Sequence, residues 1–508
     1  MSRRPRLTTA QLAVFMAVLT LFSKVLSFVR EMVLANYFGA GIITDAYVMA
    51  QSIPNSLLAA VISAVGISYM PNFSKKLELE GEESANLFTS QLVNLQLLII
   101  AAVVAAGSVF AGPLVNLFAP GFSEEAAALT AWYLRPAFCV LFFTMLAYIF
   151  GAWLNYKGIF LPQMVFGILQ NVVLIIIVAV SASVDYHLLI LGPLFGYGVY
   201  GVLHVLWARK NGFRYTPNFS LNEAVSDVLR LAIPVFLGGY VNQINLAIDK
   251  MLASGLTTGC VSALNYANQI INSISALTVT IFVTILYPRL NKAFVQGEYE
   301  RMSSLSERGI RLICVLSVPF SMGLICYASD VIRVIFERGA FDPQATVLTA
   351  SALSFYSVGL AFLSVNTLIT KIYYSMHDTK TAVRCSAVSV LLNIVLNLVL
   401  VRYMAHAGLA LATSISHMAN TVLLVYTFRR RYPQIRLMAA PQALLKLLAI
   451  SAVSVAGSRL LYGVMGAGLL NLMLCAGLAV LVYLALLWLL RFDEIRLLRD
   501  LIARRRAK

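Results

Sequence analysis

The chain has 508 residues, of which 60% are hydrophobic and only 12% are charged, and its mean hydropathy is +0.83. Soluble globular proteins contain about 45–50% apolar and about 25% charged residues, so this composition excludes an ordinary soluble enzyme. The net charge of +16 does not indicate a nucleic-acid partner, because the Lys and Arg residues lie mostly in loops between apolar runs. The sequence predicts an all-α integral membrane protein.

Fourteen apolar runs follow one another along the chain, each long enough to cross a bilayer as a helix. The first run follows Arg3, Arg4 and Arg6, contains Lys24 and Arg30, and shows no small-residue cleavage site. These features indicate an uncleaved first span and not a signal peptide. We expect helices near residues 10–37, 43–70, 90–118, 127–154, 160–181, 187–207, 222–252, 258–287, 309–332, 346–375, 384–402, 408–428, 440–461 and 468–490.

The Lys and Arg residues between these runs are shared unevenly between the two sides of the membrane. Alternate loops and both chain ends hold most of them, including Arg491 and Lys508 in the C-terminal tail. The opposite loops hold only Arg333, Arg338, Arg402 and Arg459. Because cytoplasmic loops carry an excess of Lys and Arg, this distribution predicts that both termini lie in the cytoplasm.

The chain also contains an internal repeat. Residues 46–51 and 70–75 are echoed by residues 263–269 and 287–292, and residues 120–123 by residues 339–342. The offset corresponds to six helices, so we expect two parallel six-helix lobes, which is a transporter plan with the substrate path between the lobes. The predicted lobes cover residues 1–215 and 216–436, and residues 437–508 form two additional helices and a basic cytoplasmic tail.

The first helix carries the most informative charged residues inside the membrane. Lys24 and Glu31 are seven residues apart and share a face, and Arg30 lies about 120° further round. An intramembrane charge is expensive and normally faces a protein or water-filled interior, so these cations predict a cavity for an anionic substrate, with a phosphate or diphosphate as the best match. The alternative is an internal ion pair between Arg30 and either Glu31 or Asp45.

Other polar residues in the apolar runs suggest further contacts. Arg135, Lys250 and Lys371 are also deep in their runs and are candidate substrate contacts. Asn55 follows Pro54 in the second helix, where a kink suits a gating helix but is equally consistent with an ordinary structural bend.

A second group of residues offers oxygen ligands. Asp249, Asn393, Asn397 and Thr413 combine one carboxylate with neutral oxygens, which suits a hard monovalent cation such as a coupling ion. A hydrogen-bonded clamp between helices is at least as good an explanation. The scattered cysteines and histidines share no ligand spacing, and the chain has no phosphate-binding G-x-x-x-x-G-K-[ST] loop.

Several stretches resemble the MurJ (MviN) lipid II flippase family, and the similarity extends over the whole chain. They are residues 23–31, 37–41, 44–46, 336–342, 356–359, 378–381 and 408–414, together with Tyr374. The resemblance implies the fold of the multidrug/oligosaccharidyl-lipid/polysaccharide (MOP) exporter superfamily, with fourteen helices and a groove for a polyprenyl tail formed by the last two.

The resemblance also implies a function. Such a protein moves lipid II, the undecaprenyl-diphosphate-linked peptidoglycan precursor, from the inner to the outer leaflet of the bacterial cytoplasmic membrane by alternating access. It is a transporter and not an enzyme. Its implied partners are lipid II or a related polyprenyl-diphosphate glycolipid, the membrane and the cell-wall synthesis machinery, and its implied coupling ion is Na⁺ or H⁺.

Carried over to this chain, the family's cavity cations fall on Lys24 and Arg30, and its helix 2 aspartate falls on Asp45. The family usually has an arginine just after the Pro-Asn of helix 2, where this chain has Ser56, and another on helix 8, where it has Gln269. Arg135, Lys250 or Lys371 are candidates to replace these missing charges.

Two other functions remain open from the sequence. A related exporter of another polyprenyl-linked glycan or of a drug-like solute is the nearest alternative, although a cation exporter should line its cavity with carboxylates and this first lobe is basic. An integral enzyme acting on the same lipid would need paired carboxylates or a histidine site near one interface. The acidic pairs of this chain, such as Glu124 with Glu125, have no nearby histidine in sequence.

Overall fold

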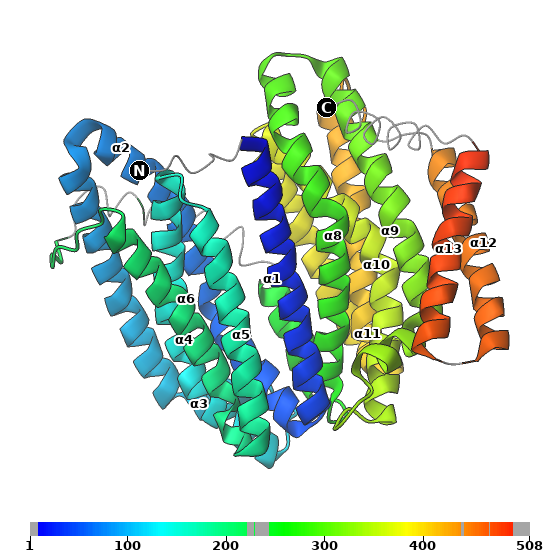
Figure 1. Cartoon of the computed structure of the whole chain (residues 1–508), viewed down its shortest axis with the longest axis horizontal. Helices are drawn as coiled ribbons and strands as arrows, with labels where there is room; N and C mark the ends of the chain where they lie inside the picture. Colours follow the sequence, from blue (N-terminus) through cyan, green and yellow to red (C-terminus); the bar gives the residue numbers. More distant parts are fainter. Residues whose placement is uncertain (1–8, 221–227, 229–242, 438–440, 467, 491–508) are drawn as a thin grey trace, which may run out of the picture. The chain divides into compact units, whose positions relative to one another are not determined.

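The computed structural model describes residues 9–220, 228, 243–437, 441–466 and 468–490 (Figure 1). Within this part of the chain every regular element is a helix, which confirms the predicted all-α class. The elements are α1 (Thr9–Phe38), α2 (Ile42–Val109), α3 (Ala111–Phe118), α4 (Glu124–Tyr156), α5 (Leu161–Ser183), the 3₁₀ helix η1 (Tyr186–Ile190), α6 (Leu191–Lys210), α8 (Cys260–Val295), α9 (Tyr299–Phe336), α10 (Pro343–Ser375), α11 (Thr379–Arg431), α12 (Pro441–Met465) and α13 (Leu469–Leu489). A further helical stretch covers residues 243–254.

Among the described residues, nine helices are long and apolar enough to cross a membrane, so the protein is a multi-pass membrane protein. The predicted number of fourteen is not reproduced, partly because some helices run together. Helix α11 has 53 residues, about 80 Å at 1.5 Å per residue, against about 30 Å for a hydrocarbon core. Its backbone is non-helical at Ala405, and that of α2 is non-helical at Gly81. Both breaks fall where the sequence predicts a loop between two spans.

Some predicted features lie wholly or partly outside the described residues. The helix expected at 222–252 is described at residue 228 and from residue 243 onward. The basic residues before Thr9 and the basic tail from Arg491 to Lys508 also fall outside the described part of the chain.

The chain forms two compact units. The first comprises Met1–Ser262 with Arg338–Asp342, and the second comprises Ala263–Glu337 with Pro343–Lys508. The first unit therefore extends beyond the repeat boundary predicted at 215/216. The short segment Arg338–Asp342 joins it because the Ala340 amide donates to the Asn36 carbonyl at 2.8 Å. A Cβ atom on Gly39 would lie 2.3 Å from the Ala340 oxygen, so this close approach requires glycine.

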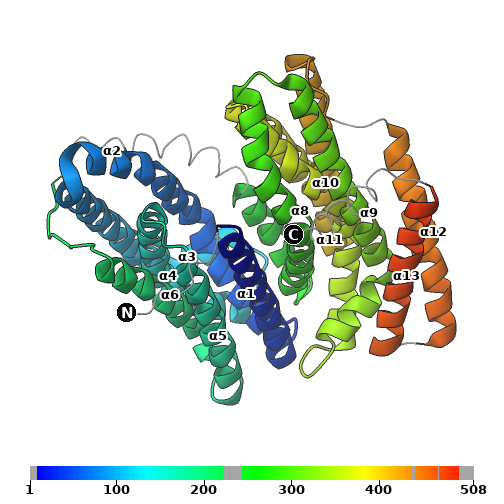
Figure 2. The same ribbon diagram turned by 45° about the horizontal axis from the view of Figure 1, so that its top comes forward.

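In the first unit, α4 packs against both α2 and α6, and α5 packs against α1 and α6 (Figure 2). Large aromatic side chains fill the interior, among them Trp153, Tyr69 and Phe138, each fully buried. On the outside, apolar residues such as Ile176 of α5 remain exposed. This arrangement suits a bundle whose outer surface contacts hydrocarbon and leaves the interior to the few polar residues.

In the second unit, α10 packs on α9 and α11, while α12 and α13 pack on each other and on α9. Arg459 of α12 forms an ion pair with Asp330 of α9 at 2.5 Å, and its guanidinium lies 5.0 Å from the ring centre of Tyr327. The Tyr327 hydroxyl is hydrogen bonded to Ser458 at 2.7 Å. These contacts fasten α12 to α9. The outward side chain of Val464 is 86% exposed, so the α12–α13 pair presents an apolar surface.

Candidate functional site

A cavity of about 620 Å³ lies inside the first unit, among α1, α2, α4, α5 and α6. Lys24 reaches it from α1, and Gln51, Pro54 and Asn55 line it from α2. Pro54 lies within α2, where a proline removes one backbone hydrogen bond and leaves a carbonyl without its usual donor. The sequence-predicted residues Lys24 and Asn55 therefore meet in one cavity.

The other polar groups of this cavity come from residues that the sequence did not single out. They are Thr144 and Tyr148 of α4, Gln170 of α5, and Tyr197 and Tyr200 of α6. Gln51 and Gln170 are amides within apolar runs, and this contrast could have identified them. The tyrosines gave no such signal, because aromatic residues in an apolar run look like ordinary core residues. Of the described residues that line the cavity, Lys24 alone is charged.

Arg30 is paired within its own helix. Its Nη2 donates to Glu31 Oε1 at 2.6 Å, and Glu31 is only 6% exposed. This is one of the two ion pairs that the sequence left open, and it is the one with Glu31. Arg30 also interacts electrostatically with Tyr47 and Tyr197, the second of which lines the cavity. Arg30 therefore lies close to the cavity wall although its side chain is not part of the lining.

Lys250 belongs to the helical stretch 243–254 of the first unit, and its ammonium donates to the Ser52 hydroxyl of α2. It interacts electrostatically with Asp249 and Glu31. Among the residues that the structure describes, the cations near the cavity are thus Lys24, Arg30 and Lys250, and the carboxylates are Glu31 and Asp249. Within this described set, three positive charges against two negative ones leave one positive charge in excess, which favours an anionic ligand.

Asp45 has a different environment from the one predicted. It is 3% exposed, and its carboxylate accepts hydrogen bonds from the Gly259 amide, the Ser262 amide and the Ser262 hydroxyl, each at 2.7 Å. These three donors hold Gly259 and the first turn of α8 against the start of α2. In this structure the carboxylate is therefore occupied by protein donors.

Arg135 lies away from the cavity. It is exposed, and its Nε is 3.5 Å from the Ser108 carbonyl. Cavity-lining Ala137 follows it by two residues on α4, so Arg135 projects about 200° round the helix from that position.

Lys371 and Gln269 both lie in the second unit. The Lys371 ammonium lies 5.5 Å from the ring centre of Tyr374. Gln269 is partly buried on α8, where its carbonyl accepts a hydrogen bond from the Ser273 hydroxyl. Neither residue is among those that line the cavity of the first unit.

The predicted cation ligands divide between the units. Asp249 belongs to the first, whereas Asn393, Asn397 and Thr413 belong to α11 in the second. Within α11, the Asn397 amide donates to Asn393 Oδ1 at 2.7 Å, and the Asn393 amide donates to the Thr413 hydroxyl at 3.4 Å. Their oxygens are of the type that a hard cation prefers. Asn393 Oδ1, however, already accepts a hydrogen bond, so these contacts match the clamp interpretation.

The described residues contain no group of three or more His, Cys, Asp or Glu that could hold a metal ion.

Comparison with known proteins gives consistent results. A family model described as "Lipid II flippase MurJ" matches residues 34–483. A protein described as "Probable lipid II flippase MurJ" from Rickettsia prowazekii is 28% identical over 432 residues, covering 82% of this chain and 83% of the relative. A protein with the same description from Vibrio cholerae is 29% identical over 429 residues, covering 81% of each. The "Lipid II flippase MurJ" of Burkholderia cenocepacia is 28% identical over 431 residues, covering 81% of this chain and 82% of the relative.

Solved structures agree on the fold. A structure described as "Lipid II flippase MurJ, inward closed conformation" matches with a TM-score of 0.83 at 24% identity, covering 95% of this chain and all of the other. An inward-facing multidrug resistance MATE family transporter of the MOP superfamily matches with a TM-score of 0.65 at 12% identity, covering 80% of this chain and 94% of the other. These matches show a fold similar to those of MurJ and MATE structures, while the fourteen helices and the two six-helix lobes expected from the sequence are not confirmed by them. Since the family model covers most of its length, the chain belongs to the lipid II flippase MurJ family.

Proposed function

We propose that this protein moves lipid II across the cytoplasmic membrane of a bacterium, from the inner to the outer leaflet, without a chemical reaction. The observation that carries this proposal is the cavity containing Lys24, together with the excess positive charge formed by Lys24, Arg30 and Lys250 against Glu31 and Asp249. A diphosphate linked to a sugar and a lipid is the anionic group that such a chain would carry.

The cavity lining suits a head group of mixed chemistry. A lysine ammonium binds phosphate as a point charge, and the amides of Gln51, Asn55 and Gln170 supply donors and acceptors for hydroxyl and carbonyl groups. Tyrosine rings offer apolar faces with a polar edge, which fits sugar rings. The volume of about 620 Å³ is within the range of about 300–1,000 Å³ for ligand pockets and accommodates part of a large head group.

The lipid tail needs a separate path, because an isoprenoid chain is stable only in hydrocarbon. We assign it to the apolar surface of α12 and α13, where side chains such as Leu460 and Val464 are strongly exposed. The head group then passes through the protein interior while the tail stays in the membrane. The two compact units are the two bodies that alternating access requires. The basic loops and both termini lie on the cytoplasmic side.

Transport against a gradient requires an energy source, and we propose Na⁺ or H⁺ coupling. Asp249 offers a carboxylate in the first unit, and Asn393, Asn397 and Thr413 offer neutral oxygens as a separate candidate in the second. Transport measured in matched sodium and potassium buffers at several pH values identifies the ion. A dependence on sodium indicates Na⁺, and a dependence on pH alone indicates H⁺.

The central experiment is depletion of the protein in its native host, followed by an assay of how much lipid II is accessible from outside the membrane. Plasmid-borne wild-type protein should restore outward exposure, and Lys24→Ala should not. Lys75→Ala is a matched control, because Lys75 is an exposed lysine of α2 outside the cavity lining. Unchanged exposure of lipid II on depletion, in a host without a second flippase, would overturn the proposal.

A further inference from the structure

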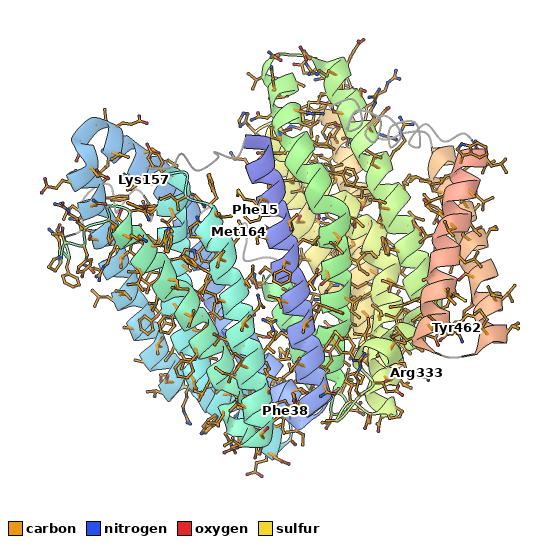
Figure 3. The ribbon with its side chains drawn as sticks, in the orientation of Figure 1. Phe15, Phe38, Lys157, Met164, Arg333 and Tyr462 are labelled. Carbon is orange, nitrogen blue, oxygen red and sulfur yellow. The ribbon has the colours of Figure 1, made fainter. Side chains whose placement is uncertain are left out.

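A second cavity, of about 820 Å³, lies within the first unit at the opposite end from Lys157. Figure 3 shows Phe38, which lines this cavity, and Lys157 at opposite ends of that unit. The cavity is bounded by the α1–α2 connection, the first three turns of α4, η1 and Thr258. Glu125 and Trp132 are seven residues apart on α4 and therefore share the face that lines it.

Aromatic rings form one wall of this second cavity. Trp132 is 40% exposed and Tyr186 is 41% exposed, so both rings present free surface. The His187 ring is stacked on Tyr186 with ring centres 4.2 Å apart, and it meets Trp132 edge-on at 5.0 Å. The Tyr133 hydroxyl donates to the Tyr186 carbonyl at 2.7 Å, which holds η1 against α4. The rings are thus held in place by their neighbours.

The charge of the second cavity is opposite to that of the Lys24 cavity. Glu125 contributes a carboxylate to the lining, and this carboxylate forms no hydrogen bond or ion pair with any residue that the structure describes. Beside the lining, the Asp185 carboxylate accepts from the His187 amide at 2.9 Å and lies 2.8 Å from His187 Nδ1. These hydrogen bonds lower the pKa of Asp185 from its usual value. No Lys or Arg is among the described lining residues.

We propose that this second cavity binds an ammonium group, held between the faces of Trp132 and Tyr186 and the carboxylate of Glu125. An alkylammonium ion over an aromatic face is attracted by the ring quadrupole, most strongly for tryptophan, and a carboxylate in the same site adds a charge-assisted contact. The ammonium has two sources: the amine of a phospholipid head group, or an amine on the peptide part of the transported head group. The second source rests on the proposed function.

The test uses purified full-length protein in a non-ionic detergent and tetramethylammonium chloride as the probe, with equal concentrations of sodium chloride as the reference. Binding next to Trp132 should change tryptophan emission in a saturable way with tetramethylammonium and not with sodium. Glu125→Gln should raise the dissociation constant about tenfold. Glu124→Gln is the matched control, because it removes an adjacent exposed carboxylate that does not line the cavity.

Two further measurements complete the test. Tyr186→Leu should raise the dissociation constant, since it removes one ring. Reconstitution in nanodiscs of phosphatidylethanolamine should weaken tetramethylammonium binding relative to phosphatidylglycerol if a lipid amine occupies the cavity, and leave it unchanged if the amine arrives with the cargo. Equal responses to both salts, or equal affinities for Glu125→Gln and Glu124→Gln, would overturn the proposal. The titration contains no lipid II, so its result is independent of the flippase assay.

Discussion

The ammonium of Lys250 donates a hydrogen bond to the hydroxyl of Ser52, and this bond joins the helical stretch 243–254 to α2. Ser52 lies between Gln51 and Asn55 in sequence, and both of these residues line the Lys24 cavity. The contact therefore places a cation from a distant part of the chain beside the segment of α2 that forms the cavity wall.

Replacing Lys250 with Met should weaken head-group binding about tenfold, because it removes one of the three positive charges that the structure places near the cavity. Ser52→Ala is the matched control, since it removes the hydrogen-bond partner and keeps the charge. Binding of a short-chain lipid II analogue by calorimetry is the measurement. Equal losses in the two variants would show that the hydrogen bond matters and that the charge does not.

Replacing Arg30 with Ala should destabilise the protein by about 3 kcal/mol and abolish transport, because it leaves the buried Glu31 carboxylate without its ion-pair partner. The double variant with Glu31→Gln should recover the stability, since the uncompensated charge is gone. Its transport should stay lost if Arg30 also contributes to binding phosphate. Thermal unfolding in detergent and flipping in vesicles are the two measurements, and recovery of both would assign Arg30 a purely structural role.

Asp45→Asn should lower the free energy of unfolding by about 2 kcal/mol, because a neutral amide replaces a carboxylate that accepts three hydrogen bonds. Transport per folded molecule should be unchanged, since this carboxylate contacts only protein donors in the structure. Glu78→Gln, an exposed position on the same helix, serves as the control and should leave the unfolding midpoint unaltered. Loss of transport without loss of stability would instead support a substrate contact at Asp45.

Asp249→Asn should reduce any dependence of transport on sodium, because it removes the candidate carboxylate ligand of the first unit. Asn393→Ala tests α11, because it breaks the hydrogen bonds of Asn393 to Asn397 and Thr413. For each variant, transport rates are measured in sodium and potassium buffers of equal ionic strength. A lost sodium dependence indicates an ion site at the replaced residue. A sodium dependence unchanged in both variants leaves α11 with a clamp alone.

The sequence predicted helices well where local signals mark their ends. Helix α5 was expected at 160–181 and covers Leu161–Ser183, with a proline in its first turn. The breaks at Gly81 and Ala405 fall in predicted loops, but the sequence did not show that helix continues up to each of these residues from both sides, because polar residues in a loop also form helix.

The candidate site was predicted in part, for reasons of helical phase and residue type. Lys24 was identified because a charge in an apolar run is conspicuous, and Asn55 because it follows Pro54, which is expected to kink the helix. Arg135 was equally conspicuous but projects from a different side of α4 than the lining residue Ala137. Which side of α4 faces the cavity is set by the packing of the helices, and the sequence does not give that packing. Tyr148 and Tyr200 could not be distinguished from core aromatics until the helices were assembled.

The attachment of α12 to α9 through Arg459 and Asp330 has a thermodynamic consequence for transport. A lipid tail lying on α12 and α13 keeps the same protein neighbours throughout the cycle, because that surface moves together with α9. Its contact energy is then equal in the inward-facing and outward-facing states and cancels from the difference between them. A ligand shifts a conformational equilibrium only by its differential affinity for the two states. On the proposed function, the tail therefore sets how long the lipid stays bound without shifting the equilibrium between the two states, and the head group and the coupling ion are left to decide which way the protein faces.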